Sequence, residues 1–149
     1  MLQMLEMAER FHESASRALD GSGPLREEVV YQNLSYALEL GLKAFVRANG
    51  WTDDRCRREI RHDLVKAYEA ARSVGLPALE GQTVRMLVIL APFHVSHTLD
   101  EFVRGGSLAL GPACSLLLTG KLLEQVRCSI GRSAALTTVW PLTRIAAPA

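Results

Sequence analysis

A short basic segment carries the residues of this sequence whose types and spacing could act on a phosphodiester. Arg57 and His62 satisfy an R-x4-H spacing. In such a pair the imidazole can move the proton of an attacking 2′-hydroxyl, and the guanidinium can stabilise the negative charge that grows on the phosphate. The same segment holds three further basic side chains that could bind nucleotide or RNA phosphates, namely Arg58, Arg61 and Lys66.

The same basic residues also fit a plain solvent-exposed helix face. If the segment were helical throughout, Arg58, His62 and Lys66 would be i,i+4 neighbours. Acidic residues are interleaved with them and would neutralise much of the positive charge: Asp53, Asp54, Glu59, Asp63 and Glu69. His62 or Asp63 could instead cap a helix that begins at Leu64. Phosphate binding, catalysis and a purely structural face therefore all stay open for this segment.

A second pair of charged residues lies on an earlier candidate helix. Glu39 and Lys43 are an i,i+4 pair in the orientation that stabilises a helix, and we assign them a structural role. Gly41 falls in the apolar stripe of the same helix. Glycine inside a helix costs about 1 kcal/mol relative to alanine, so we expect a close crossing by another helix there.

Two histidines near residue 95 raise the question of a metal site. His94 and His97 are three positions apart and could share a helical face, and Asp100 and Glu101 could add oxygen ligands. Two histidines alone do not make a metal site, and Pro92 argues against a regular helix at this point. We therefore predict no metal site. No phosphate-cradling GxxxxGK[ST] motif is present either, and we predict no cofactor.

The composition is that of one ordinary globular domain. The chain has 149 residues, of which 48% are apolar and 22% charged, with a formal net charge of +1. No global field attracts nucleic acid, so any basic site must be local. The N-terminal stretch lacks the pattern of a signal peptide, and the longest apolar stretch, 86–91, is far shorter than the roughly 18 residues of a membrane span. We expect a cytoplasmic protein with no membrane contact.

The three cysteines fit the same compartment. Cys56, Cys114 and Cys128 are odd in number, widely spaced and form no CxxC pair. This pattern excludes a disulfide framework and a zinc-finger pattern. We expect three buried or partly buried free thiols in a reducing environment.

Apolar periodicity predicts an all-α chain. Stripes at helical spacing cover 2–19, 26–48, 62–74, 82–91 and 113–130, although 82–91 alone could also be a strand. A short charged helix is expected at 53–60, and whether it continues into 62–74 stays open. Residues 94–104 are expected to be irregular or a turn or two of helix. Short connections between four to five helices imply an up-down bundle. We assign residues 1–131 to a single domain and 132–149, with a β-like run at 137–140, to a tail whose order stays open.

Two short motifs in this order give the chain a family resemblance. Glu39 and Lys43 match an E-x3-K element on a helix with small and aliphatic neighbours, and His62, Asp63 and Leu64 match an H-D-L element that opens the next helix. The order and separation of the two motifs resemble the HEPN family of helical bundles. The matched region is a third to a half of the chain.

The resemblance implies a four- or five-helix up-down bundle that forms a homodimer. It also implies binding of nucleotide or RNA, or partnership with a nucleotidyltransferase in toxin–antitoxin modules. Some HEPN members are metal-independent ribonucleases with an R-x(4–6)-H motif in a late helix, whereas Arg57 and His62 lie in the middle of this chain. A non-catalytic nucleotide- or RNA-associated module is therefore the leading hypothesis. The alternatives are a ribonuclease using Arg57 and His62, and a protein–protein interaction bundle without a ligand.

Overall fold

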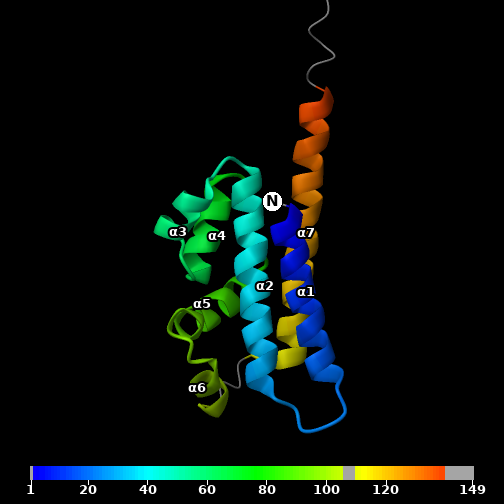
Figure 1. Ribbon diagram of the computed structural model, residues 1–149, viewed down its shortest axis with the longest axis vertical. Helices are drawn as coiled ribbons and strands as arrows, with labels where there is room; N and C mark the ends of the chain where they lie inside the picture. Colours follow the sequence, from blue (N-terminus) through cyan, green and yellow to red (C-terminus); the bar gives the residue numbers. More distant parts are fainter. Residues whose placement is uncertain (1, 106–109, 140–149) are drawn as a thin grey trace, which may run out of the picture.

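A computed structural model describes residues 2–105 and 110–139, and this part of the chain is helical without any strand (Figure 1). The predicted all-α class is confirmed, whereas the predicted number of four to five helices is not. The described residues form seven helices: α1 Leu2–Asp20, α2 Glu27–Ala48, α3 Asp53–Glu59, α4 Leu64–Ser73, α5 Gly81–Ser96, α6 Leu99–Arg104 and α7 Pro112–Val139.

The three longest helices pack side by side and form a bundle around α2. Helix α1 runs antiparallel to α2, and α7 returns parallel to α2 and packs against both α1 and α2 (Figure 1). Helices α4, α5 and α6 cover the remaining face of α2. A Cβ atom built on Gly41 would lie 2.5 Å from Cδ2 of Leu123 on α7. The predicted close crossing at Gly41 is therefore confirmed, because a larger residue would push the two helices apart.

Helices α3 and α4 are separate, and the α3–α4 turn (residues 60–63) joins them. The Thr52 hydroxyl accepts a hydrogen bond from the Arg55 amide at 3.1 Å and begins α3. The Asp63 carboxylate accepts from the amides of Val65 and Lys66 and begins α4. Between the helices, Arg61 takes a left-handed conformation with φ of 54°. Of the two candidate caps, Asp63 is the one used, and because the helix breaks here, Arg58, His62 and Lys66 do not have the i,i+4 spacing of a continuous helix.

Helix α5 continues through Pro92 to Ser96, so the prediction of irregular backbone at residue 94 is wrong. Pro92 lies on the exposed side of the helix, where water can solvate the carbonyl group that loses its partner. The helix ends where His97 takes a left-handed conformation with φ of 56°. His94 therefore stays on the inner face of α5, while His97 lies beyond the helix and is exposed.

Helix α7 is longer than predicted. It extends to Val139, so the predicted boundary at residue 131 falls inside a helix and the β-like prediction for 137–139 is wrong. Residues 140–149 lie outside the described residues. The side chains at 131–135 are exposed, which explains why apolar periodicity gave no sign of the last turns. No helix in the described part of the chain is long and apolar enough to cross a membrane.

The three thiols differ in environment. Cys56 is buried, which confirms the expectation for this residue, and burial raises the pKa of its thiol. Cys114 and Cys128 are exposed on α7, so the expectation of buried or partly buried thiols is wrong for these two. Helix α7 presents one side to the bundle and leaves these positions on the other.

Candidate functional site

A carboxylate buried in the middle of α2 is the centre of the candidate site. Glu39 keeps only 4% of its surface exposed. It lies between Leu38 and Leu42, which belong to the apolar stripe of α2, so the helix turns the side chain toward the interior. A carboxylate in such a place is stable only when hydrogen bonds and opposite charge replace its lost hydration.

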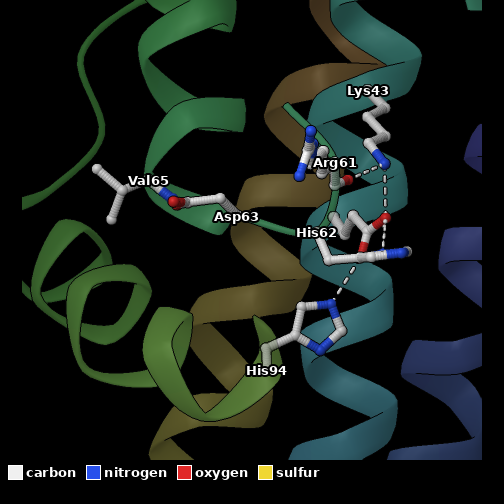
Figure 2. Close-up of polar contacts among 7 residues, drawn as sticks. Lys43, Arg61, His62, Asp63, Val65 and His94 are labelled. Carbon is white, nitrogen blue, oxygen red and sulfur yellow. Dashed lines mark hydrogen bonds and ion pairs between the residues drawn. The ribbon is translucent and has the colours of Figure 1, made fainter. Parts of the chain in front are cut away.

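Three side chains provide that replacement, and they come from three parts of the chain. His94 Nε2 lies 2.6 Å from Glu39 Oε2, and Lys43 Nζ lies 2.6 Å from Oε1. His62 Nδ1 lies 3.1 Å from Oε1 and 3.2 Å from Oε2. Figure 2 shows Lys43, His62 and His94 pointing toward one another from α2, the α3–α4 turn and α5. These four residues are called the buried cluster below.

The α3–α4 turn is held in place by the same cluster. Lys43 lies one helical turn after Glu39 and also donates a hydrogen bond to the backbone carbonyl of Arg61 (Figure 2). Backbone hydrogen bonds from Arg61 and Asp63 to carbonyls of α3 and the turn close the bend. Because these hydrogen bonds fix the backbone on both sides of His62, its side chain lies over the carboxylate of Glu39.

His94 reaches the carboxylate from the last turn of α5. Its side chain is 2% exposed, and the ring of Tyr36 meets it edge to face with centroids 5.1 Å apart. The ring therefore has a fixed plane, as side chains that bind metals or move protons need.

The electrostatics of the cluster favour the ionised carboxylate. Burial alone raises the pKa of Glu39, but hydrogen bonds from His94 and Lys43, the charge of Lys43 and the hydrogen bond from His62 outweigh it and lower that pKa to about 2. Glu39 is therefore an anion throughout the neutral range. It can orient a histidine, pair with a lysine or bind a cation.

One side of the cluster is open to solvent. The His62 side chain is 56% exposed, and its ring lies 6.2 Å from the ring of His97 and 6.2 Å from that of His94. A small hollow of about 140 Å³ lies beside it. Its lining includes Tyr36, His94, His97 and Asp100. A small ligand atom can thus approach His62 and His97 from outside.

The predicted basic residues divide into two groups. Arg55 and Arg58 form i,i+4 ion pairs with Glu59 and Asp54, both at 3.0 Å. Arg55 also stacks on the Trp51 ring at 3.6 Å. These contacts neutralise part of the predicted phosphate-binding surface, Arg58 included.

The remaining basic side chains are exposed and carry uncompensated charge. Within residues 2–105 and 110–139, Arg57, Arg61 and Lys66 make no side-chain ion pair or hydrogen bond. Arg57 lies on α3 and His62 in the α3–α4 turn, and no hydrogen bond or ion pair between described residues joins the two side chains.

His94 and His97 do not share a helical face. His94 is buried against Glu39, His97 lies beyond the end of α5, and Asp100 forms an ion pair with Arg104 at 2.9 Å. Sequence reasoning missed the pairing of His94 with Glu39. The available signal was helical spacing, because His94 continues the buried stripe of Leu87 and Leu90.

Glu39, His62 and His94 each offer a metal-ligating atom, and in the described part of the chain these atoms all lie within 4.8 Å of one another.

The comparisons with known proteins add no further assignment: neither a family model, nor a curated protein, nor a solved structure matches this chain.

Proposed function

We propose that this helical bundle is a HEPN-like module that binds a phosphate-bearing ligand, a nucleotide or RNA, over the α3–α4 turn. The observation that carries the proposal is the uncompensated charge of Arg57, Arg61 and Lys66 on one exposed segment beside His62. Phosphate oxygens attract such side chains, and an oriented imidazole adds a further donor.

The ligand would be held by side chains rather than by the start of α4. The free amides at a helix start commonly bind phosphate, but here the Asp63 carboxylate already accepts from the amides of Val65 and Lys66. A phosphate at that place would have to displace an anion. Binding through Arg57, Arg61 and Lys66 needs no such rearrangement.

The spatial relation of the two motif elements supports the HEPN-like part of the proposal. Glu39 and Lys43 of the first element contact His62 of the second, while Asp63 caps α4 and Leu64 is buried. The motif residues thus lock α2 to the α3–α4 turn, which gives their order and separation a physical reason. On the same resemblance we propose a homodimer, and a nucleotidyltransferase partner in a toxin–antitoxin module.

Titration with a fluorescein-labelled mixed-sequence RNA and with ATP tests the binding proposal. The variant Arg57→Ala/Arg61→Ala/Lys66→Ala removes the uncompensated charge. A matched control, Arg10→Ala/Arg17→Ala/Arg132→Ala, removes three positive charges from α1 and α7 instead. We expect only the first variant to weaken binding and to lower the slope of log K against log salt by about 2, since each phosphate contact to a single strand contributes about 0.7. Equal loss in both variants would show nonspecific attraction and reject the site.

RNA cleavage is the second candidate function, favoured by the contact between Glu39 and His62. The carboxylate holds His62 through Nδ1, which leaves Nε2 available on the exposed side of the ring. An imidazole oriented in this way can serve as a general base. Arg57, on the same segment, would stabilise charge on the phosphate.

Cleavage of mixed-sequence RNA in excess chelator tests this candidate, with the protein concentration varied across any dimerisation. We expect His62→Ala and Arg57→Ala each to abolish the wild-type activity, with His97→Ala as the histidine control. If wild type does not cut, the ribonuclease is rejected, whereas the binding proposal is decided by the titration.

A protein–protein interaction bundle is the remaining alternative and requires a continuous exposed apolar surface. The large exposed apolar side chains of the described residues are Leu2, Met7, Leu25, Val88, Val95 and Leu117. They lie on α1, the α1–α2 connection, α5 and α7, with at most two on any one element. Among the side chains that the structure describes, no single helix therefore presents an apolar face of the usual docking kind.

A further inference from the structure

The buried cluster contains more polar side chains than are needed to orient His62 alone. Besides Lys43, it brings two imidazole nitrogens and a carboxylate oxygen within 4.8 Å of one another. Zinc binds histidine nitrogen at about 2.0–2.1 Å and carboxylate oxygen at about 2.0–2.2 Å, so the ligand atoms of a tetrahedral site are about 3.4 Å apart. His62 Nδ1 lies 3.2 Å from Glu39 Oε2, which is close to that separation, and His94 Nε2 at 2.6 Å needs to move outward by less than 1 Å.

We propose that Glu39, His62 and His94 bind one divalent transition-metal ion of the Zn²⁺ class. Imidazole nitrogen suits zinc and its neighbours in the first transition row, and a carboxylate supplies the negative charge. Two histidines and one glutamate form one of the donor sets of zinc sites that keep a fourth position open. The site stands on the geometry of these three residues and does not depend on the RNA or nucleotide proposal.

The two oxygens of Glu39 have separate roles in this arrangement. Oε2 lies within hydrogen-bond distance of both histidines, whereas Oε1 accepts the hydrogen bond from Lys43 at 2.6 Å and lies 3.1 Å from His62 Nδ1. The ion would take Oε2 together with the two ring nitrogens, and Lys43 would keep Oε1. A hydrogen bond to the second oxygen fixes the orientation of a ligating carboxylate, as partners around metal sites commonly do.

The protein holds the three ligands in place before the ion arrives. Glu39 and His94 are buried on helices, and the α3–α4 turn that carries His62 is tied to α2 by the hydrogen bond from Lys43 to the Arg61 carbonyl. Little conformational entropy is then lost on binding, so the affinity is greater than for ligands on free loops.

The fourth coordination position would be on the solvent side. His62 is more than half exposed, its ring lies near that of His97, and the small hollow is lined by His94 and His97. Water can occupy that position and be replaced by an anionic oxygen, for example of a phosphate. His97 is 6.2 Å from His62 between ring centroids and is not part of the three-residue site, which makes it a suitable control.

Calorimetric titration of tag-free, chelator-treated protein with ZnCl₂ tests the proposal. Cys114→Ser/Cys128→Ser serves as the background, because the two exposed thiols could bind zinc by themselves. We expect one Zn²⁺ per chain with a Kd in or below the micromolar range. His62→Ala should weaken binding by about 100-fold or more, since loss of an outer partner alone costs about 10–100-fold, and His97→Ala by about twofold at most.

Cobalt substitution gives a second readout that needs no change in the ligands. Co²⁺ in a low-symmetry site with a histidine and carboxylate donor set should produce a visible d–d absorption that one equivalent of Zn²⁺ removes. Absence of zinc binding in the parent protein would overturn the proposal. So would unchanged affinity in a folded His62→Ala variant, or an equal loss in His97→Ala, which would place the ion elsewhere. Zinc binding is read out without RNA or nucleotide, and RNA cleavage is tested in chelator, so failure here is distinguishable from failure of the proposed function.

Discussion

Two groups of paired acidic and basic side chains lie near the α3–α4 turn, and they differ in sequence separation and in burial. The buried cluster joins Glu39 to His62 and His94, which are 23 and 55 residues away, and Glu39 is 5% exposed as a side chain. The α3 ion pairs, Arg55–Glu59 and Arg58–Asp54, join residues one helical turn apart, and their side chains are 47–74% exposed. Burial rather than charge separates the two groups.

The difference has consequences for both stability and function. An exposed ion pair contributes about 0.2–1 kcal/mol at most, because water screens the charges and the side chains lose freedom. A buried carboxylate is different, because removal of one of its partners leaves a buried charge without hydration and strongly destabilises the fold. The α3 pairs only reduce the local positive charge, whereas the buried cluster fixes the distances among three elements.

Glu39→Gln should have the largest effect. The substitution keeps the shape of the side chain but removes the charge that Lys43 and the histidines need. We expect the free energy of unfolding to fall by about 3–5 kcal/mol in metal-free buffer. Urea denaturation followed by circular dichroism measures it, and Glu59→Gln, which affects an exposed pair, should cost less than about 1 kcal/mol. Equal effects of the two substitutions would remove the distinction between the groups.

Acid should also act mainly through the buried cluster. The pKa of Glu39 is about 2 in the folded protein and 4.5 in the reference state, so the folded value is depressed. A depressed pKa adds stability that is fully present above pH 4.5 and is lost as the pH falls toward 2. The 2.5-unit difference corresponds to about 3 kcal/mol at 1.36 kcal/mol per unit.

Comparison of wild type with Glu39→Gln isolates this contribution from the other carboxylates. We expect the stability difference between the two proteins, measured by urea denaturation, to narrow steadily from pH 5 to pH 2.5. A difference that stays constant over this range would mean that Glu39 titrates with an ordinary pKa and that its partners do not hold it ionised.

The sequence predicts local features of this fold well, because their causes lie within a few residues. The helical stripes, the cap at Asp63 and the close crossing at Gly41 all follow from spacing and residue type. The end of α7 does not, since the side chains at 131–135 are exposed and no apolar stripe marks this part of the helix.

The contacts within the buried cluster could not be predicted from the local sequence, for a different reason. The pair of Glu39 and Lys43 was visible as an i,i+4 pattern, but its contact with His94 depends on α5 continuing past Pro92. Local propensity argues against that continuation, and packing of α5 on α2 outweighs it. Arg57 and His62 belong to neighbouring elements rather than to one continuous helix, because α3 ends at Glu59 and α4 begins at Leu64.

The smallest expected effect concerns the α3 ion pairs themselves. A double-mutant cycle with Asp54→Ala and Arg58→Ala should give a coupling energy of about 0.3–0.5 kcal/mol, because both side chains are exposed. In 1 M NaCl, where the Debye length is about 3 Å, most of this coupling should vanish. The matching cycle with Glu39→Gln and Lys43→Met should give a larger coupling that salt hardly changes, since water and ions do not reach the buried pair. A salt-sensitive coupling between Glu39 and Lys43 would mean that the buried cluster opens to solvent. That result would contradict both the large stabilising effect expected for the cluster and its preformed geometry for metal ligands.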